Sequence, residues 1–448
     1  MVSPWCHPGV KRLRYPELVV PKPVALVTHP QYLGGDATAK PQAPGHTLEV
    51  TNVDVTKLER LIDSKRIVDD LVEMIQCESV NPFDAAPTPG NREAEFAELY
   101  LRKMTNAGLA VGSHQVVAGR SNVWGRLTAM GPLAGTGPSV MLAGHIDTVG
   151  VDGYDQPFSA HINDGRVFGR GACDMKAALA AYLEVVRVLR AAEVGLTGDV
   201  VVAGICDEEH KMTGSVEFGR TGPRADVAII GEPTELAVCP AHKGQVCLVI
   251  TTSGTAVHSS RPELGVNAIV AISQVIQALG TYADDLRLGE SHALCGVATT
   301  NPGVIRGGTI ASTVPDLCHL EIDRRTLPGQ NYELVKAELQ ALLEPLRSKG
   351  LRFDISEPTL NAHPLDTPLD HPLVSAVLSA ASNVLQTAVL PTAFPAATDA
   401  PNLGIPSVIC GPGSLTDAHT LHESVAIEDV VAATKIYLRS ILSLQGLI

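Results

Sequence analysis

The sequence lacks the long apolar run that a membrane-spanning helix requires. None of its 448 residues belongs to an uninterrupted stretch of about 18 to 20 apolar side chains. The start, Met1–Cys6, also lacks the apolar core of a secretory signal. We therefore expect a soluble protein of the cytoplasm that has no membrane partner.

An excess of basic residues is also absent. The chain has 34 Lys and Arg against 48 Asp and Glu, a formal net charge of −14. Nucleic acids and anionic membranes bind basic surfaces that displace their counterions. Neither is an expected partner, and a small molecule or a metal ion fits this charge better.

The nine cysteines are scattered and form no Cys-x-x-Cys pair. This spacing excludes a zinc knuckle and a dithiol redox motif, so most cysteines should be reduced and buried. At 448 residues, of which 45% are hydrophobic, the chain can bury a large core and should divide into two domains or more.

Four apolar, strand-like runs each precede residues of metal-ligand type. In open α/β sheets, ligands bind beyond the carboxyl ends of the parallel strands, so side chains that follow such runs should converge in space. Asp174 fits between them, because it follows Gly169–Gly171 and opens an amphipathic helix predicted over residues 175–189. The four runs are Val140–Ala143 before His145 and Asp147, Val200–Cys206 before Asp207, Glu208 and Glu209, Val227–Ile230 before Glu232, and Val408–Cys410 before His419.

The residue types in this set indicate the kind of metal site. Two imidazoles and at least three carboxylates, without a thiolate cluster, suit Zn²⁺, Mn²⁺ or Co²⁺. They fit a two-metal site better than a closed structural zinc site. Two cations about 3.5 to 4 Å apart need a bridging ligand, and Asp174 is the best-placed carboxylate. Of the neighbours Glu208 and Glu209, one can bind metal while the other acts as general base.

The pattern along the chain predicts an α/β protein with an insert. Residues 1–50 are rich in proline and should form an extended or wrapped N-terminal arm. We expect a catalytic domain, a mixed sheet flanked by helices, from residues 51–241 and 357–448, and a smaller α+β insert from residues 242–356. One helix or a pair of helices is predicted over 56–76. Further helices are predicted over 91–107, 265–279, 332–346 and 373–385, and strands over 245–253 and 317–323.

Five segments, taken in order, resemble the acetylornithine deacetylase, succinyl-diaminopimelate desuccinylase and glutamate carboxypeptidase family. Each motif alone is weak, but their order and separation over about residues 60 to 448 are specific. The segments are Gly144–Val149, Gly169–Lys176, Asp207–Glu209, Gly231–Thr234, and Ala418–His419 with Glu423.

The resemblance implies a zinc-peptidase-like fold, a role for each ligand, and two divalent metal ions, zinc first and cobalt or manganese as alternatives. It also implies a cis peptide between Asp174 and Met175. His422 competes with His419 as the last ligand, and the spacing to Glu423 favours His419. The implied roles are His145 and Glu232 on one metal, Glu209 and His419 on the other, Asp174 on both, Glu208 as general base, and Asp147 as the residue that orients His145.

The insert resembles the lid and dimerisation domain of this family, which implies a homodimer. His258 would reach the partner subunit's active site and stabilise the oxyanion, unless it only caps a loop. Arg325 would hold a substrate carboxylate, with a structural ion pair as the alternative. Ser312 stands where relatives have a substrate-binding asparagine, and Thr398 would shape the substrate pocket or cap a helical turn.

The expected activity is hydrolysis of the amide bond of an N-acyl amino acid by metal-activated water, with Glu208 as general base. A carboxypeptidase or dipeptidase acting on a small peptide is the alternative within the same chemistry. A non-catalytic ligand-binding relative is a further alternative. It is disfavoured because the base, the bridging residue and the ligands are all present.

Overall fold

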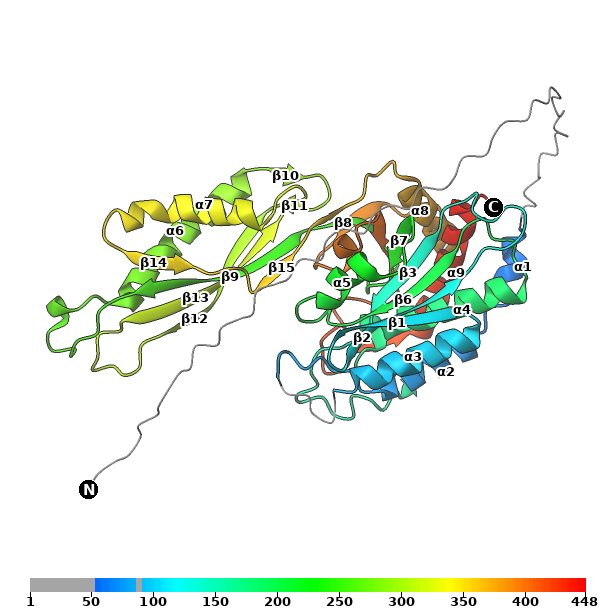
Figure 1. Ribbon diagram of the computed structural model, residues 1–448, viewed down its shortest axis with the longest axis horizontal. Helices are drawn as coiled ribbons and strands as arrows, with labels where there is room; N and C mark the ends of the chain where they lie inside the picture. Colours follow the sequence, from blue (N-terminus) through cyan, green and yellow to red (C-terminus); the bar gives the residue numbers. More distant parts are fainter. Residues whose placement is uncertain (1–52, 86–90) are drawn as a thin grey trace, which may run out of the picture. The chain divides into compact units, whose positions relative to one another are not determined.

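The computed structural model describes residues 53–85 and 91–448, so the arm predicted over residues 1–50 lies outside the described residues. In this part of the chain, each helix is too short or too polar to cross a membrane. The helices are α1 (Val55–Glu59), α2 (Ser64–Gln76), α3 (Glu93–Ala107), α4 (Ala177–Ala191), α5 (Thr213–Thr221), α6 (Ala268–Leu288), α7 (Tyr332–Arg347), α8 (Pro372–Leu385) and α9 (Ile427–Leu444), with short turns η1 (Ala172–Lys176), η2 (Pro262–Leu264) and η3 (Ala400–Leu403) (Figure 1).

The larger sheet contains the four apolar runs as adjacent parallel strands, β6, β3, β7 and β18. All four are buried along their whole length, which explains why they read as continuous apolar runs. Antiparallel strands flank them, so this mixed sheet confirms the predicted fold class. Its order is β1 (Ala110–Val117), β2 (Arg120–Leu127), β6 (Val200–Ile205), β3 (Val140–His145), β7 (Val227–Ile230), β18 (Ser407–Ile409), β8 (Val238–His242) and β16 (Leu365–Asp366), with β17 (Pro391–Phe394) also beside β8.

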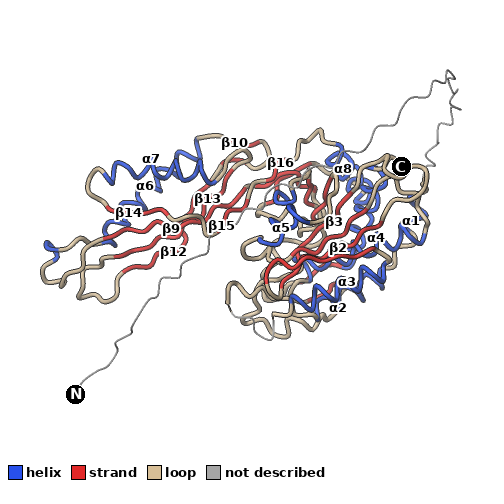
Figure 2. The backbone as a smooth tube through the Cα atoms, in the orientation of Figure 1, coloured by secondary structure: helices blue, strands red, loops and turns tan. Residues whose placement is uncertain are grey.

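Helices cover both faces of this sheet. Alternate side chains of each strand therefore pack into hydrophobic cores on opposite faces. Val140 and Leu142 of β3 pack with α2, α3, α4, α8 and α9, whereas Met141 and Ala143 pack on the other face with α5 and η3. Figure 2 shows the helices in blue beside the strands in red.

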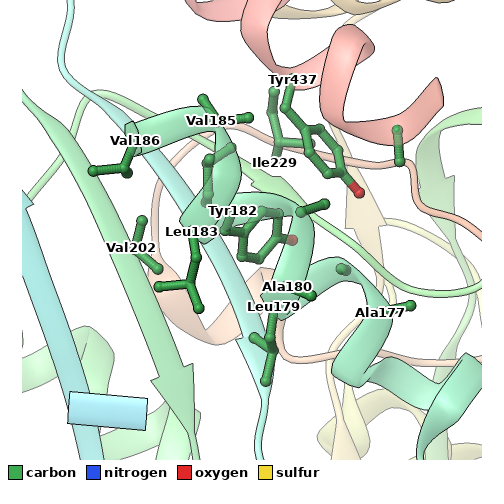
Figure 3. Packing of buried hydrophobic residues seen from close by; sticks show 14 of the residues in the cluster. Ala177, Leu179, Ala180, Tyr182, Leu183, Val185, Val186, Val202, Ile229 and Tyr437 are labelled. Atoms are coloured by element: carbon green, nitrogen blue, oxygen red, sulfur yellow. The ribbon is translucent and has the colours of Figure 1, made fainter. Parts of the chain in front are cut away.

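Helix α4 connects the core to the strand ends. Tyr182 of α4 lies beside Tyr437 of α9, with ring centroids 5.1 Å apart (Figure 3). The Tyr182 hydroxyl donates to the carbonyl of Ala143 at 2.9 Å, and the Tyr437 hydroxyl donates to that of Cys410 at 2.8 Å. The two tyrosines therefore hold β3 and β18 close to their carboxyl ends.

The insert forms its own antiparallel sheet, in the order β12 (Thr299–Gly307), β13 (Leu317–Thr326), β9 (Gly244–Ser253) and β14 (Arg352–Ile355), with β15 (Leu360–Ala362) also beside β9. Alternate residues of β9 are buried, because α6 and α7 cover one face of the sheet. The exact bounds 242–356 stay a prediction, and β15 lies just beyond them. The small sheets are β19 (Ser424–Ala426), β5 (Arg166–Phe168) and β4 (Ile162–Asn163), and β10 (Ser291–His292) with β11 (Gly296–Val297).

Most predicted elements are present, with differences at their ends. The helix predicted over 265–279 continues to Leu288 as α6, and the segment predicted over 56–76 is a pair of helices, α1 and α2. Helix α9 was not among the predicted elements. Each cysteine in the described part of the chain is a free thiol and most are buried, as expected.

Candidate metal centre

The parallel strands deliver the predicted ligands to one edge of the larger sheet. Strand β3 ends at His145, β6 precedes Glu209, β7 precedes Glu232, and the segment after β18 carries His419. Asp174 lies in η1, where the backbone departs from helical geometry. The peptide bond between Asp174 and Met175 is cis, as the family resemblance implied.

Asp174 lies between the two histidines. Its Oδ1 is 2.9 Å from His145 Nε2, and its Oδ2 is 3.3 Å from His419 Nε2. Glu232 Oε2 lies 3.8 Å from His145 Nε2, and Glu209 Oε2 lies 3.2 Å from His419 Nε2. The ligand-type atoms thus fall into two groups joined by one carboxylate. This grouping agrees with the assignment that the family resemblance implies, and the metal-binding roles stay a prediction.

The chemistry of these residues fits divalent cations. Glu209 Oε1 and Glu232 Oε1 are buried and accept no hydrogen bond from the described residues. A buried carboxylate oxygen without a partner is costly, and a cation would satisfy both. One atom each of His145, Asp174 and Glu209 can lie within 4.8 Å of the others. Imidazole and carboxylate together suit zinc, manganese or cobalt.

The electrostatics of the site also favour a cation. Burial raises the pKa values of Glu209 and Glu232 above their ordinary values. Hydrogen bonds to Asp174 and Glu209 raise the pKa of His419 to about 10. Carboxylates crowded away from water create a negative potential, in which positive charge is stabilised.

The structure separates the two candidates for the last ligand. His419 Nε2 faces Asp174 and Glu209, and its backbone φ of 63° lies in the left-handed region. The side chains of both histidines are exposed, so exposure does not separate them, and the backbone N–H of His422 donates to Thr420 Oγ1 at 3.4 Å. The geometry therefore favours His419.

Asp147 acts through its backbone and its carboxylate in different ways. Its carbonyl oxygen lies 2.9 Å from His145 Nδ1, whereas its carboxylate is 3.9 Å from that nitrogen. A carbonyl only accepts, so Nδ1 carries the proton and Nε2 is free to bind metal. The carboxylate instead accepts the backbone N–H groups of Glu208 and Glu209, each at 3.2 Å.

The sequence reasoning assigned no role to Glu423, although it belonged to a motif. Its Oε1 accepts from the backbone nitrogens of Cys173 and Asp174 at 2.9 and 3.0 Å, and its Oε2 pairs with Arg170. Glu423 thus holds the turn that carries Asp174. The one sequence signal that pointed to Glu423 was its place in the last motif, after His419.

The insert residues make their hydrogen bonds within the insert. His258 is exposed, and its Nδ1 lies 2.8 Å from Ser260 Oγ. The Ser312 carbonyl accepts from the Ser259 nitrogen at 2.9 Å. Arg325 pairs with Asp323 through contacts of 3.0 and 3.1 Å, so the structure contains the ion pair that was the alternative reading. Their roles toward substrate stay predictions.

Thr398 is buried beside β8 and η3. Its Oγ1 lies 3.1 Å from His242 Nε2 and accepts from the Ala400 nitrogen at 3.2 Å. The second contact satisfies a backbone donor at the start of η3, as the capping alternative expected. Its neighbour Asp399 is also buried. The charge of Asp399 raises the pKa of Glu208, which burial already raises well above its ordinary value.

Comparisons with known proteins agree with this architecture. The chain is 30% identical over 366 residues to an acetylornithine deacetylase of Vibrio campbellii, covering 79% of this chain and 92% of the relative. It is 27% identical over 415 residues to the N-formyl-4-amino-5-aminomethyl-2-methylpyrimidine deformylase of Bacillus subtilis, covering 85% and 96%. The solved YXEP protein of Bacillus subtilis, described as a dinuclear metal-binding peptidase, matches with a TM-score of 0.63 and 16% identity over 86% of this chain and 100% of that one.

The family itself follows from a match over most of the chain. Residues 141–443 match the peptidase family M20/M25/M40, a span that runs from β3 to α9 and includes every predicted metal ligand. This confirms the resemblance inferred from the motifs. The chain therefore belongs to the peptidase family M20/M25/M40 and is a hydrolase of amide or peptide bonds.

Proposed function

We propose that this hydrolase removes an acyl group from the nitrogen of an amino acid or a closely related amine. The observation that carries the proposal is Glu208, whose backbone is fixed beside a cluster of ligands bridged by Asp174. The two relatives named above, a deacetylase and a deformylase, are both named for removing an acyl group. Free thiols throughout the described residues support a reducing compartment, the cytoplasm.

The five candidate ligands would hold two divalent cations, with zinc as the first expectation and cobalt or manganese as alternatives. When bound, the ions would polarise the scissile carbonyl and lower the pKa of a water molecule. A dinuclear site is supported by the two groups of ligand atoms and by the description of the YXEP protein. The assignment is His145 and Glu232 to one ion, Glu209 and His419 to the other, and Asp174 to both.

Glu208 would act as the general base. Its carboxylate would take a proton from the attacking water and later deliver it to the leaving nitrogen. Asp147 supports this role, since one carboxylate accepts the N–H groups of both Glu208 and Glu209. The base and a metal ligand are thereby held in a fixed relation to each other.

The test is the substitution Glu208→Gln, which preserves shape and removes the proton acceptor. Loss of a general base should lower kcat by about 10²- to 10⁴-fold, while two ions per chain remain bound. Metal content and amine release from N-acetyl, N-formyl and N-succinyl amino acids would be measured. Glu217→Gln, on α5, serves as the control. Substantial activity in Glu208→Gln would rule out this assignment.

A peptidase is the second candidate, favoured by the structural likeness to a dinuclear metal-binding peptidase. Both activities use the same base and metals, so the substrate panel must include dipeptides. Release of amino acids from dipeptides, with no release from N-acyl amino acids, would replace the first proposal by the second.

We also propose a homodimer formed through the insert. Strand β12 lies at the edge of the insert sheet, and apolar side chains of β12 and α6 are exposed, among them Ile305, Val304, Val270 and Ile269. Open strand edges and exposed apolar patches are features of association surfaces. In such a dimer, His258 would complete the site of the partner subunit. Light scattering should give twice the chain mass, and Ile305→Lys should yield monomers with lower activity.

A further inference from the structure

Arg120, at the start of β2, gathers three buried carboxylates. Its Nε donates to Glu93 Oε2 and its Nη1 to Asp207 Oδ1, both at 2.7 Å, and its Nη2 lies 3.9 Å from Asp147 Oδ2. The side chain of Arg120 is 13% exposed, and those of the three acids are at most 4% exposed. Charges so far from water interact strongly.

Asn81 connects two of these acids. Its Nδ2 donates to Asp147 Oδ2 at 2.8 Å and to Asp207 Oδ1 at 3.1 Å. Asp207 itself has a φ of 69°, in the left-handed region, at the turn that leads into Glu208. Its other carboxylate oxygen accepts from the Thr213 nitrogen at 3.2 Å. The turn is thus held by the side chains of Asp147 and Asp207, which lie close together.

Two carboxylates that share one donor atom repel each other. Here Asn81 is neutral, so the repulsion between Asp147 and Asp207 needs a cation, and Arg120 supplies it. Without that cation, the repulsion would weaken the hydrogen bonds that Asp147 accepts from the nitrogens of Glu208 and Glu209. Glu93, at the start of α3, accepts a hydrogen bond from Nε of the same guanidinium.

We propose that Arg120 is a positioning residue of the metal centre, which holds the backbone of Glu208 and Glu209 by balancing the charges of Asp147 and Asp207. The proposal rests on the ligand and base roles proposed above. Arginine suits this position because its planar fork reaches several carboxylates at once, whereas a lysine ammonium is a single point charge.

The experiment compares Arg120→Lys and Arg120→Met with the same changes at Arg126. Arg126 lies on the same strand and pairs with Asp199 at 2.5 Å. Asp199 takes no part in the site. Metal-free protein would be titrated with Zn²⁺ or Co²⁺ against a chromophoric chelator. Arg120→Lys should weaken metal affinity about 10- to 100-fold, as is usual for partners of metal ligands, alter the absorption spectrum of bound Co²⁺, and lower kcat more than it changes KM.

Metal affinity and a Co²⁺ spectrum equal to those of wild type in folded Arg120→Lys would overturn the proposal. If Arg120→Met does not fold, the lysine variant decides. Failure of Arg120→Lys to fold, while Arg126→Lys folds, would also overturn it, because Arg120 would then serve the core alone. Wild-type metal stoichiometry and amine release are measured separately, so failure of the proposed function is distinguished from failure of this inference.

Discussion

Replacement of Glu423 by glutamine should destabilise the protein by about 3 to 5 kcal/mol, the usual cost of removing one partner of a buried ion pair. Glu423 and Arg170 are 0% and 2% exposed. Glutamine keeps one acceptor oxygen, but its amide group would turn a donor toward Arg170 or toward the nitrogens of Cys173 and Asp174. Arg170 retains carbonyl partners at 3.2 and 3.3 Å, which places the expected cost near the lower value.

Urea unfolding, followed by circular dichroism, would measure the change in midpoint at constant slope. Glu357→Gln is the matched control, because it is the same substitution in a pair with Lys336 that is 76% and 28% exposed. Exposed pairs contribute about 0 to 1 kcal/mol. Metal affinity should also fall in Glu423→Gln, since Glu423 holds the backbone nitrogen of Asp174, and should stay unchanged in the control.

Two results would refute this reasoning. The first is a loss of stability in Glu423→Gln no greater than in Glu357→Gln. The second concerns the double variant Glu423→Gln with Arg170→Met, which replaces the remaining charge by an apolar side chain and should recover part of the loss. A double variant no more stable than Glu423→Gln would mean that an unpaired Arg170 is not the cause.

Burial lowers the pKa of His242 to about 4 from the ordinary 6.5. As the pH falls, His242 is therefore protonated in the unfolded chain before it is protonated in the folded one. The stability contribution of neutral His242 should be lost as the pH falls from about 6.5 to about 4, and urea midpoints of His242→Gln should lack that slope; parallel curves would contradict this. A methyl group at Gly231 would collide with Ala178 and the Tyr182 hydroxyl, so Gly231→Ala should cost about 1 to 3 kcal/mol. At Gly280 a Cβ atom would meet no described atom within 4 Å beyond its chain neighbours and the nearby backbone of its own helix, so Gly280→Ala should stabilise α6 by up to about 1 kcal/mol. Equal melting temperatures of Gly231→Ala and Gly280→Ala would refute the comparison. Chelation should lower the melting temperature of wild type and added zinc should restore it, because the ions bind only the folded chain; an unchanged temperature would argue against a metal centre.

The parallel strands and the ligand types could be predicted because they depend on local patterns. A strand buried on both faces reads as a nearly continuous apolar run, so β3, β6, β7 and β18 were visible as short runs made mostly of Val, Ile, Leu, Met and Ala. The residue that follows each run had to lie at one edge of the sheet. Helix α9 was not predicted, although its buried residues, such as Val430, Tyr437 and Ile441, have helical spacing.

The contacts around these ligands could not be predicted, since they join distant parts of the chain. Asp147 and Arg325 were candidates because of their residue types and their places in the motifs. Yet only the structure shows that the Asp147 carboxylate holds the turn at Glu208, and that Arg325 is paired with Asp323. No local periodicity distinguishes a charged side chain that faces substrate from one that faces another charge.

The sequence by itself determined the fold class, the family and the set of metal-ligand types, because each depends on residues close in the chain and on their order. Only the tertiary structure decided which carboxylate lies between the two histidines and which charges support it. Glu423 meets Asp174, and Arg120 meets Asp207, across long stretches of chain. Such pairs form where packed strands and helices bring their ends together, and the balance of buried charge there depends on distances in space rather than on positions in the sequence.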